Sequence, residues 1–384
     1  MTPTVETLPD GATLVRHTPP ADGVPVTWRL DEELRIGTME GGGPAQFGRV
    51  GGLDVAPDGR IIVLDAQAQD IRVFDADGRH LRTLGRKGGG PGELEGANGV
   101  VLGEDGLLRV PDGRNDRVSY FDLDAGFVRS YPYTPLYVTW TFDGVLDENG
   151  VLWAIHRIPP DQPGERGQEA YVGYDSAGVA VDTLPRPVEH RDPRNDPGFW
   201  AIERDGRMMA SLGVPFYARA QHVLDRRLRF WSTVLGDPTY RLERRDPGAE
   251  PDLVIETGRP LQPVDRAAAD SIAAGWEREY AVRLDRSKIP ENAPAIINFF
   301  MDDDERLWVV ARTPDSDSTG TLDAYDSIDG RWLGTLVADF PLMAYPPPVI
   351  RGDRVWAVVW DELDVSYVVQ GRMVGVGDEP EPEP

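Results

Sequence analysis

Short apolar stretches recur along the chain, with polar turns between them. The first group begins with Gly52–Ala56, the turn Pro57–Asp58–Gly59 and the largely apolar stretch Arg60–Leu64. Ile71–Phe74 and His80–Leu84 follow, and another Asp-Gly pair separates these two. Asp-Gly between apolar runs is typical of a tight hairpin, because glycine readily adopts the positive φ that the turn requires. The pattern predicts a four-stranded antiparallel meander.

This unit is repeated. Residues 41–77 and 88–124 align without a gap and share about a dozen identities in about 37 positions. The GGGP motif at 41–44 returns at 88–91, and Phe74-Asp75 returns as Phe121-Asp122. Looser copies of the same pattern follow along the chain. The predicted units cover about 41–85, 86–133, 138–187, 214–259, 293–340 and 345–375.

The repeats predict a closed ring. One four-stranded sheet cannot bury both of its faces, so radial packing of six such units into a propeller is the natural arrangement. The sixth unit lacks a fourth strand, while residues 26–37 precede the first GGGP where a fourth strand would stand. We therefore predict an all-β, six-bladed β-propeller over 24–377, with four-stranded antiparallel blades and an N-terminal strand that closes the last blade. Residues 1–23 are assigned to an N-terminal extension.

Two insertions interrupt the repeats. Val264–Leu284 has Asp265 as a predicted N-cap and is expected to form an amphipathic helix between units four and five, packed across one end of the ring. The apolar face of this helix is predicted to contain Ile272, Trp276 and Tyr280. Between units three and four, Arg186–Gly213 is expected to be an ordered loop without regular structure. The Glu-Pro tail, 378–384, is predicted to be disordered.

Charge and composition exclude several partners. The chain has 65 acidic and 40 basic residues, and its formal net charge of -25 repels nucleic acid and anionic membranes. It contains no cysteine, which excludes disulfides and thiolate metal sites. No stretch approaches the roughly 18 apolar residues of a membrane span, and the first residues lack the pattern of an export signal. These features do not decide the compartment.

The segment Gly85–Asp122 resembles bacterial six-bladed, TolB-like propellers of the NHL-repeat type. In that group a glycine-rich loop leads into each early blade, and a D-x-x-N-x-R-I-x-x-F-D phrase crosses from the second strand to the third. In this chain the residues that match the phrase are Asp112, Asn115, Arg117, Val118 and Phe121-Asp122. Many such proteins are exported, so the resemblance implies a periplasmic or secreted location. It adds little about chemistry.

Ligands of propellers usually bind at the mouth of the central channel. The mouth is formed by the loops that lead into the innermost strands and by the ends of the second strands. The register of the repeats places nine candidate ligand-binding residues there: Asp65, Asn98, Asp112, Trp140, His156, Tyr217, Arg219, Asn298 and Tyr345. For Asp65 and Asp112 the favoured alternative is that their carboxylates cap backbone amides of the loop that follows each of them.

A metal site has weaker support. A zinc site would need about three converging histidines, and only His156 and His222 fall on adjacent units. The acidic clusters 302–305 and 315–317 are interpreted as solvated turns, because neither has the spacing of an EF-hand. The most plausible residues around a calcium or zinc ion in the channel are Asn98, Asp112, His156 and Asn298. No local nucleophile signature is present.

Two hypotheses follow. The favoured one is a binding platform that recognises a small molecule, glycan, peptide or partner protein through the channel mouth and the inserted loops. The alternative is a calcium- or zinc-dependent lactonase, hydrolase or lyase with its ion in the central channel. Neither hypothesis includes nucleic acid as a partner or a membrane span.

Overall fold

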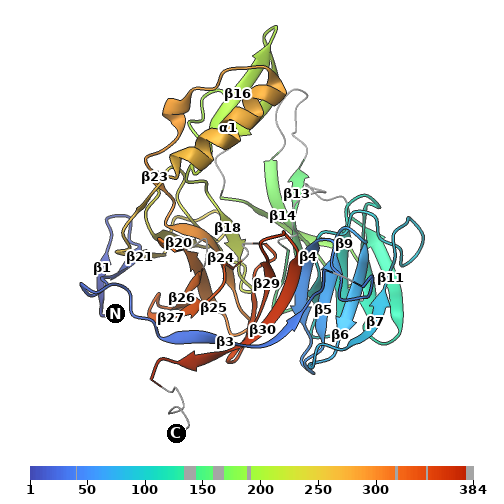
Figure 1. The fold of residues 1–384 in the computed structure, drawn as a ribbon. Coiled ribbons are helices and arrows are strands. Elements are labelled where there is room, and N and C mark those ends of the chain that lie inside the picture. Colours follow the sequence, from blue (N-terminus) through green and yellow to red (C-terminus); the bar gives the residue numbers. More distant parts are fainter. Residues whose placement is uncertain are drawn as a thin grey trace.

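The computed structural model describes residues 1–39, 41–133, 144–158, 168–187, 192–315, 319–342 and 345–377. The chain forms the predicted six-bladed β-propeller (Figure 1). Blade one contains β4 (Val50–Val55), β5 (Ile61–Asp65), β6 (Asp70–Phe74) and β7 (His80–Leu84). Blade two contains β8 (Val101–Leu102), β9 (Leu107–Asp112), β10 (Arg117–Asp122) and β11 (Gly126–Pro132). Blade three contains β12 (Val145–Leu146), β13 (Leu152–Ile158), β14 (Gln168–Tyr174) and β15 (Ala180–Pro185).

The second half of the ring follows the same order. Blade four contains β18 (His222–Leu224), β19 (Phe230–Ser232), β20 (Arg241–Arg245) and β21 (Leu253–Thr257). Blade five contains β24 (Ile296–Met301), β25 (Arg306–Ala311), β26 (Gly320–Asp326) and β27 (Trp332–Ala338). Blade six contains β28 (Val349–Arg351), β29 (Arg354–Trp360), β30 (Ser366–Gly375) and the N-terminal strand β3 (Trp28–Ile36).

The predicted closing strand is confirmed. β3 runs antiparallel to β30, and their register extends from Trp28 opposite Gly375 to Ile36 opposite Val368. The start of β3 also pairs in parallel with the end of β27, which joins blades five and six. The chain therefore closes its ring by backbone hydrogen bonds between its two ends.

The first residues form a hairpin that the sequence did not reveal. β1 (Pro3–Thr7) pairs with β2 (Thr13–His17), and β2 adds in parallel to β21 at the outer edge of blade four. Buried His17 lies with its Nε2 2.8 Å from the carbonyl oxygen of Gly330, which links the hairpin to blade five. Residues 1–17 thus connect two neighbouring blades.

The apolar core lies between neighbouring blades. Ile62 and Leu64 of β5 contribute to the cluster shared with blade two, while Ile61 and Val63 contribute to the cluster shared with blade six. Successive side chains of a strand point to opposite faces, so a strand buried on both faces must be apolar throughout. This explains the uninterrupted run Ile61–Leu64, in which every residue is fully buried.

The helix forms as predicted but packs differently. Asp265 caps α1 (Arg266–Tyr280) by accepting hydrogen bonds from the backbone amides of Ala267 and Ala268. Ala269 and Ala273 are the buried residues of α1, and Trp276 and Tyr280 of the predicted apolar face pack against the same cluster. The prediction is wrong for Ile272, which is 43% exposed. With 15 residues, α1 is too short to span a membrane, and no helix of the described segments is long and apolar enough to do so.

The expectation of an irregular loop at Arg186–Gly213 is wrong over its second half. β16 (Phe199–Arg204) and β17 (Arg207–Gly213) form a hairpin. The Asp205–Gly206 turn between them has positive φ at both residues, as a tight hairpin requires. The Trp200 ring meets Trp276 of α1 edge to face at 6.0 Å, and its Nε1 donates to the carbonyl oxygen of Asp285. Instead of spreading across the ring, α1 therefore covers the hairpin.

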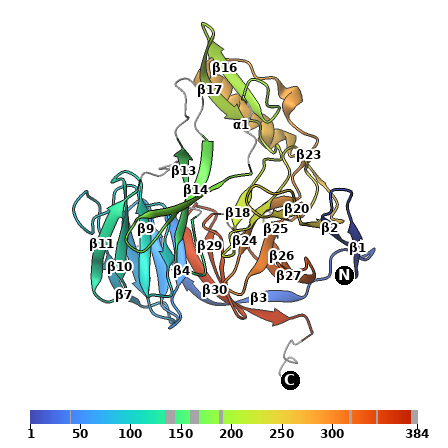
Figure 2. The same cartoon turned by 180° about the vertical axis from the view of Figure 1, so that it is seen from behind.

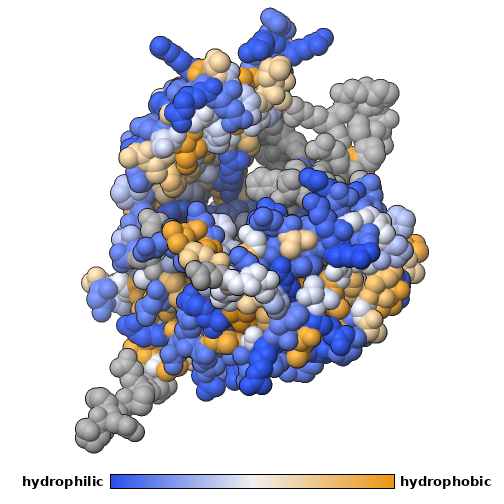
Figure 3. Space-filling model, turned by 45° about the vertical axis from the view of Figure 1, so that its right-hand side comes forward, coloured by the Kyte–Doolittle hydropathy of each residue, from blue (hydrophilic) through white to orange (hydrophobic). Residues whose placement is uncertain are grey.

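We call residues 199–213 and 262–293 the cap. Besides the hairpin and α1, the cap contains the short pair β22 (Gln262–Pro263) and β23 (Asn292–Ala293) and the 3-10 helix η1 (Arg286–Lys288). Its apolar cluster is separate from the clusters between blades. Figures 1 and 2 show the cap standing clear of the blades on one side of the ring, and Figure 3 shows it above a largely hydrophilic surface.

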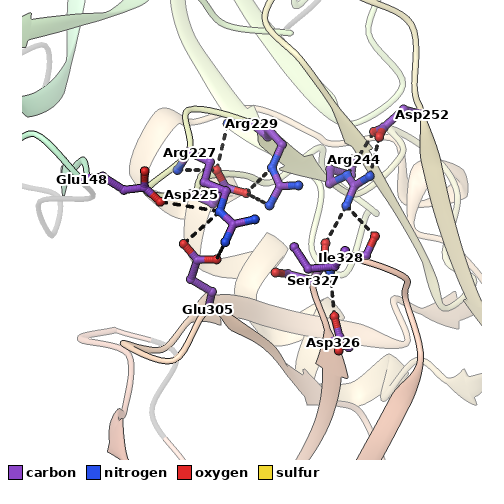
Figure 4. A network of polar contacts seen from close by, with 10 residues as sticks. All are labelled: Glu148, Asp225, Arg227, Arg229, Arg244, Asp252, Glu305, Asp326, Ser327 and Ile328. Carbon is purple, nitrogen blue, oxygen red and sulfur yellow. Dashed lines mark hydrogen bonds and ion pairs between the residues drawn. The ribbon is translucent and has the colours of Figure 1, made fainter.

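Ion pairs cross the face of the ring that lies opposite the cap. Arg227, in the turn between β18 and β19, contacts Glu305 of blade five at 2.6 Å and Glu148 of blade three at 3.6 Å (Figure 4). Its neighbour Arg226 contacts Glu104 of blade two at 2.7 Å. Four blades are thus linked through the turns between their first and second strands.

Candidate functional site

The topology of the blades puts every blade-to-blade connection on one face. Each innermost strand starts at this face, and each second strand returns to it before the third begins. The outermost strand also ends there, so both insertions between blades emerge on the same side (Figure 1). We call this side the mouth face.

A pocket of about 230 Å³ lies on the mouth face between blades four and five. Phe216, Tyr217 and Arg219 come from the loop that leads into blade four, and Thr239 comes from the loop between its second and third strands. Blade five supplies Arg312 together with the residues at the start of its innermost strand, Ile296 and Ile297. We call it the mouth pocket. It lies where the cap joins the ring, because Phe216 and Tyr217 also pack against the cap cluster.

Two glycines make room for the Tyr217 ring. A Cβ atom at Gly198 would stand 2.6 Å from Cδ1 of Tyr217, and one at Gly236 would stand 3.0 Å from its hydroxyl oxygen. Gly236 also has φ +81°, a conformation that other residues rarely adopt. The neighbouring Phe216 has φ 60°, which is costly for an aromatic residue. The aromatic side of the pocket is therefore set by unusual backbone geometry.

Arg219 joins the pocket to the cap. Its guanidinium carbon lies 4.7 Å from the centre of the Phe199 ring in β16. A Cβ atom at Gly213 would stand 1.7 Å from Nη2 of Arg219, so the guanidinium occupies the space that a side chain at position 213 would need. Burial by the surrounding protein lowers the pKa of Arg219, and the charge of nearby Asp196 partly opposes this shift. An arginine nevertheless stays charged at neutral pH.

The other charged groups of the pocket are Arg312 and Asp237. Arg312 donates from Nε to the carbonyl oxygen of Pro294 at 2.9 Å, and its guanidinium carbon lies 5.9 Å from the centre of the Phe216 ring. Asp237 accepts the backbone amide of Thr239 at 2.8 Å. Two arginines and one aspartate make the lining locally positive, although the chain has a net charge of -25.

A buried polar network fixes the base of the cap beside this pocket. Arg259, where the chain leaves blade four, donates from Nε to Asp323 of β26 at 2.9 Å. Tyr240, next to the pocket residue Thr239, donates its hydroxyl to the same carboxylate at 2.8 Å, and Thr335 donates to it at 2.6 Å. Asp323 is fully buried and satisfied by these donors. Such a network holds its members in one arrangement.

The mouth pocket brings together two of the nine predicted residues, Tyr217 and Arg219. Asp65 and Asp112 bond backbone amides instead, with Gly48 and Ala68 donating to Asp65 and Gly96 donating to Asp112 at 2.7–3.0 Å. Both carboxylates therefore cap backbone amides, as the sequence favoured. Asp65 caps the loop that follows it, as predicted, whereas the amide that Asp112 bonds lies in the loop that leads into blade two.

The remaining candidates lie elsewhere. Asn98 and Asn298 are buried, and Tyr345 is 51% exposed in the loop that leads into blade six. His156 lies with Nε2 3.1 Å from the hydroxyl oxygen of Tyr174 and edge to face with Tyr133. Trp140 lies outside the described residues.

No group of three or more histidine, aspartate or glutamate side chains that could hold a metal ion occurs among the described residues. Burial lowers the pKa of His156 to about 4 and that of His222 to about 3. Asp302 accepts Nε1–H of Trp308 and the amide of Arg306, so it shapes the predicted turn, but it is buried and not solvated as expected. Of the second acidic cluster, residues 316 and 317 lie outside the described segments.

The same register argument could have found Arg312. Ala311 ends the second strand of blade five where Asp65 ends that of blade one, so Arg312 begins the equivalent loop. Phe216 carries no comparable signal, because its place in the pocket depends on a positive φ that the sequence does not predict.

Comparisons with known proteins agree with the fold. A family model described as a 6-bladed beta-propeller matches residues 45–172. A search of curated proteins found no match. Among solved structures, a member of the duf4221 family from Bacteroides vulgatus is 10% identical, covers 91% of this chain and 99% of its own, and has a TM-score of 0.51.

Two further solved structures are similar to the chain. A protein from Bacteroides fragilis, named as a proposed exported protein, is 12% identical, with coverages of 94% and 99% and a TM-score of 0.48. The PQQ-bound aldose sugar dehydrogenase from Streptomyces coelicolor is 12% identical, with coverages of 92% and 100% and a TM-score of 0.45. At these identities the likeness concerns the fold alone.

Proposed function

We propose that this protein is a ligand-binding β-propeller whose site is the mouth pocket beside the cap. The main support is that both insertions between blades converge on this pocket. The hairpin of the first insertion contributes Phe199 against Arg219, and the cluster around α1 packs against Phe216 and Tyr217. Insertions that are not part of the blades often carry the residues that bind a ligand.

Backbone geometry and buried hydrogen bonds also hold the pocket in one arrangement. Phe216 holds a backbone conformation that costs about 1–3 kcal/mol, and such conformations cluster at binding sites. The network around Asp323 fixes the loop next to Thr239. A preorganised site loses less conformational entropy when its ligand binds.

A ligand screen by thermal unfolding tests this proposal. The native protein is melted with a panel of small acids, amines, sugars and neutral amides, because a ligand that binds only the folded state raises the melting temperature with saturation. Thr239→Trp fills the exposed rim of the pocket, and Thr183→Trp, on the exposed edge of blade three, is its matched control. Compounds that stabilise the native protein should lose their effect in Thr239→Trp and keep it in Thr183→Trp. Equal effects in both variants would contradict the proposal.

The same assay addresses the metal-dependent alternative. Calcium and zinc are added separately to protein that has been stripped of metal. A saturable rise that Asp112→Ala or His156→Ala abolishes would support the enzyme hypothesis in place of the binding platform.

We also propose that the chain is a propeller of the NHL-repeat type with an extracytoplasmic location. The glycine-rich loops at 41–44 and 88–91 and the phrase from Asp112 to Asp122 support this. Fractionation of cells that express the natural gene should place the protein outside the cytoplasm. Recovery from the cytoplasm alone would contradict the location.

A further inference from the structure

Arg219 differs from many other arginines of this acidic chain. Arg72, Arg109 and Arg244, for example, form ion pairs with carboxylates of their own or neighbouring strands and turns. Within the described segments no carboxylate is in ion-pair contact with Arg219, and its guanidinium rests on the Phe199 ring at the rim of the pocket. Asp196, which influences it electrostatically, accepts the backbone amide of Gly198 at 2.8 Å. A guanidinium held in this way can accept an external anion.

Arg312 adds a second cation to the same pocket from a different blade. The rest of the lining has an apolar part, formed by Phe216, Tyr217 and neighbouring residues of blade five, and a polar part that includes Thr239 and the carboxylate of Asp237. At about 230 Å³ the pocket is smaller than the roughly 300–1,000 Å³ of sites for drug-sized ligands. The site therefore suits a small molecule that has both a negative group and an apolar body.

We propose that the mouth pocket binds a small organic acid, with its carboxylate bonded by Arg219 in the positive field of Arg312 and its apolar body against Phe216 and Tyr217. Guanidinium groups bind carboxylates through short, charge-assisted and often bidentate hydrogen bonds. An inorganic anion would leave the aromatic side of the pocket unused. This ligand class rests on the function proposed above, because it presupposes that the mouth pocket is the binding site.

Calorimetric titration of the full chain with sodium benzoate, benzamide and inorganic phosphate tests the ligand class. Benzamide has the shape of benzoate but no charge, and phosphate has charge but no apolar body. Benzoate should bind at least about tenfold more tightly than either, since tenfold corresponds to the loss of roughly one charge-assisted hydrogen bond.

Variants test whether Arg219 supplies the positive charge that binds the benzoate carboxylate. Arg219→Gln should weaken benzoate binding about tenfold, Arg219→Lys should weaken it less, and Arg79→Gln, an exposed residue of blade one, should leave it unchanged. Gly213→Ala keeps the charge but places a methyl group where Nη2 of Arg219 lies, so it should weaken benzoate binding even if Arg219→Gln unfolds the cap.

The outcomes separate the ligand class from the site. If benzoate and benzamide bind equally and both lose binding in Thr239→Trp, the pocket is a ligand site but the proposal of an organic acid is overturned. If neither Arg219→Gln nor Gly213→Ala changes benzoate binding, the proposal of an organic acid bonded by Arg219 is also overturned. Benzoate binding that survives in Thr239→Trp would overturn both proposals.

Discussion

His222 is a buried histidine of β18 whose two ring nitrogens have no hydrogen-bond partner among the described residues. Burial lowers its pKa from 6.5 to about 3, and the charges of Arg186 and Arg245 act in the same direction. Between these two pKa values the unfolded chain binds a proton and the folded chain does not. The contribution of His222 to stability therefore falls as the pH drops below about 6.5.

His222→Leu should remove this contribution. Because no hydrogen bond is lost, we expect an unchanged or higher melting temperature at pH 7 and a gain of about 2 kcal/mol relative to the native protein at pH 4.5. Thermal unfolding at the two pH values measures both effects, with His80→Gln as the exposed-histidine control. If His222→Leu and the native protein lose equal stability between pH 7 and pH 4.5, this account is contradicted.

Asp54 has the opposite pH dependence. It lies 3.4 Å from Arg351, and burial raises its pKa to about 6. Between about pH 4 and 6 the folded chain binds more protons at this position than the unfolded chain, so the contribution of Asp54 to stability falls as the pH rises through that window. Asp54→Asn keeps an oxygen acceptor for the Leu102 amide and should gain on the order of 1 kcal/mol at pH 7. Urea unfolding at pH 4.5 and 7 should show that gain only at the higher pH; a loss at pH 7 would show that the ion pair with Arg351 dominates.

At the scale of elements, the cap has an apolar cluster of its own, centred on Trp200, Ala269, Ala273 and the partly buried Trp276. Trp200→Ala should cost the cap about 3–5 kcal/mol, the usual range for a buried tryptophan. Hydrogen exchange should then increase in β16, β17 and α1 and stay unchanged in β24–β27. A parallel increase in blade five would mean that the cap and the ring unfold as one unit.

The sequence predicts those elements whose signals are local. Asp-Gly turns and alternating apolar residues locate the hairpins of each blade. In blade two, Asn115 and Arg117 donate hydrogen bonds to the carbonyl oxygens of Gly88 and Gly90. The phrase therefore holds the glycine-rich loop of blade two in place.

The N-terminal hairpin and its pairing with blade four were missed. The parallel pairing of β2 with β21 joins segments far apart in the chain, and no local pattern marks it. In the mouth pocket the register of the repeats located Tyr217 and Arg219, because both lie at a fixed distance before an innermost strand. It did not predict that the cap hairpin would bring Phe199 to Arg219, since that contact depends on the packing of two insertions.

At the scale of the whole molecule, the ring is held closed by its N-terminal strand. β3 buries Leu30 and Ile36 and pairs with β30 over most of its length. A chain that lacks residues 1–37 should lose its cooperative unfolding transition, because blade six would have an unpaired edge and the ring would be open. Removal of residues 1–22 should only lower the melting temperature, since it takes away the hairpin that covers blade four. Circular dichroism melts of the two truncations decide this, and equal behaviour would contradict the closing role of β3.

The mouth pocket as the ligand site is the central claim, and a crystal structure of the protein with the compound that raises its melting temperature most tests it directly. The ligand should lie between blades four and five, with a carboxylate beside Arg219 and its apolar part against Phe216 and Tyr217. A ligand bound in the central channel, or on the face crossed by the ion pairs of Arg226 and Arg227, would contradict the claim.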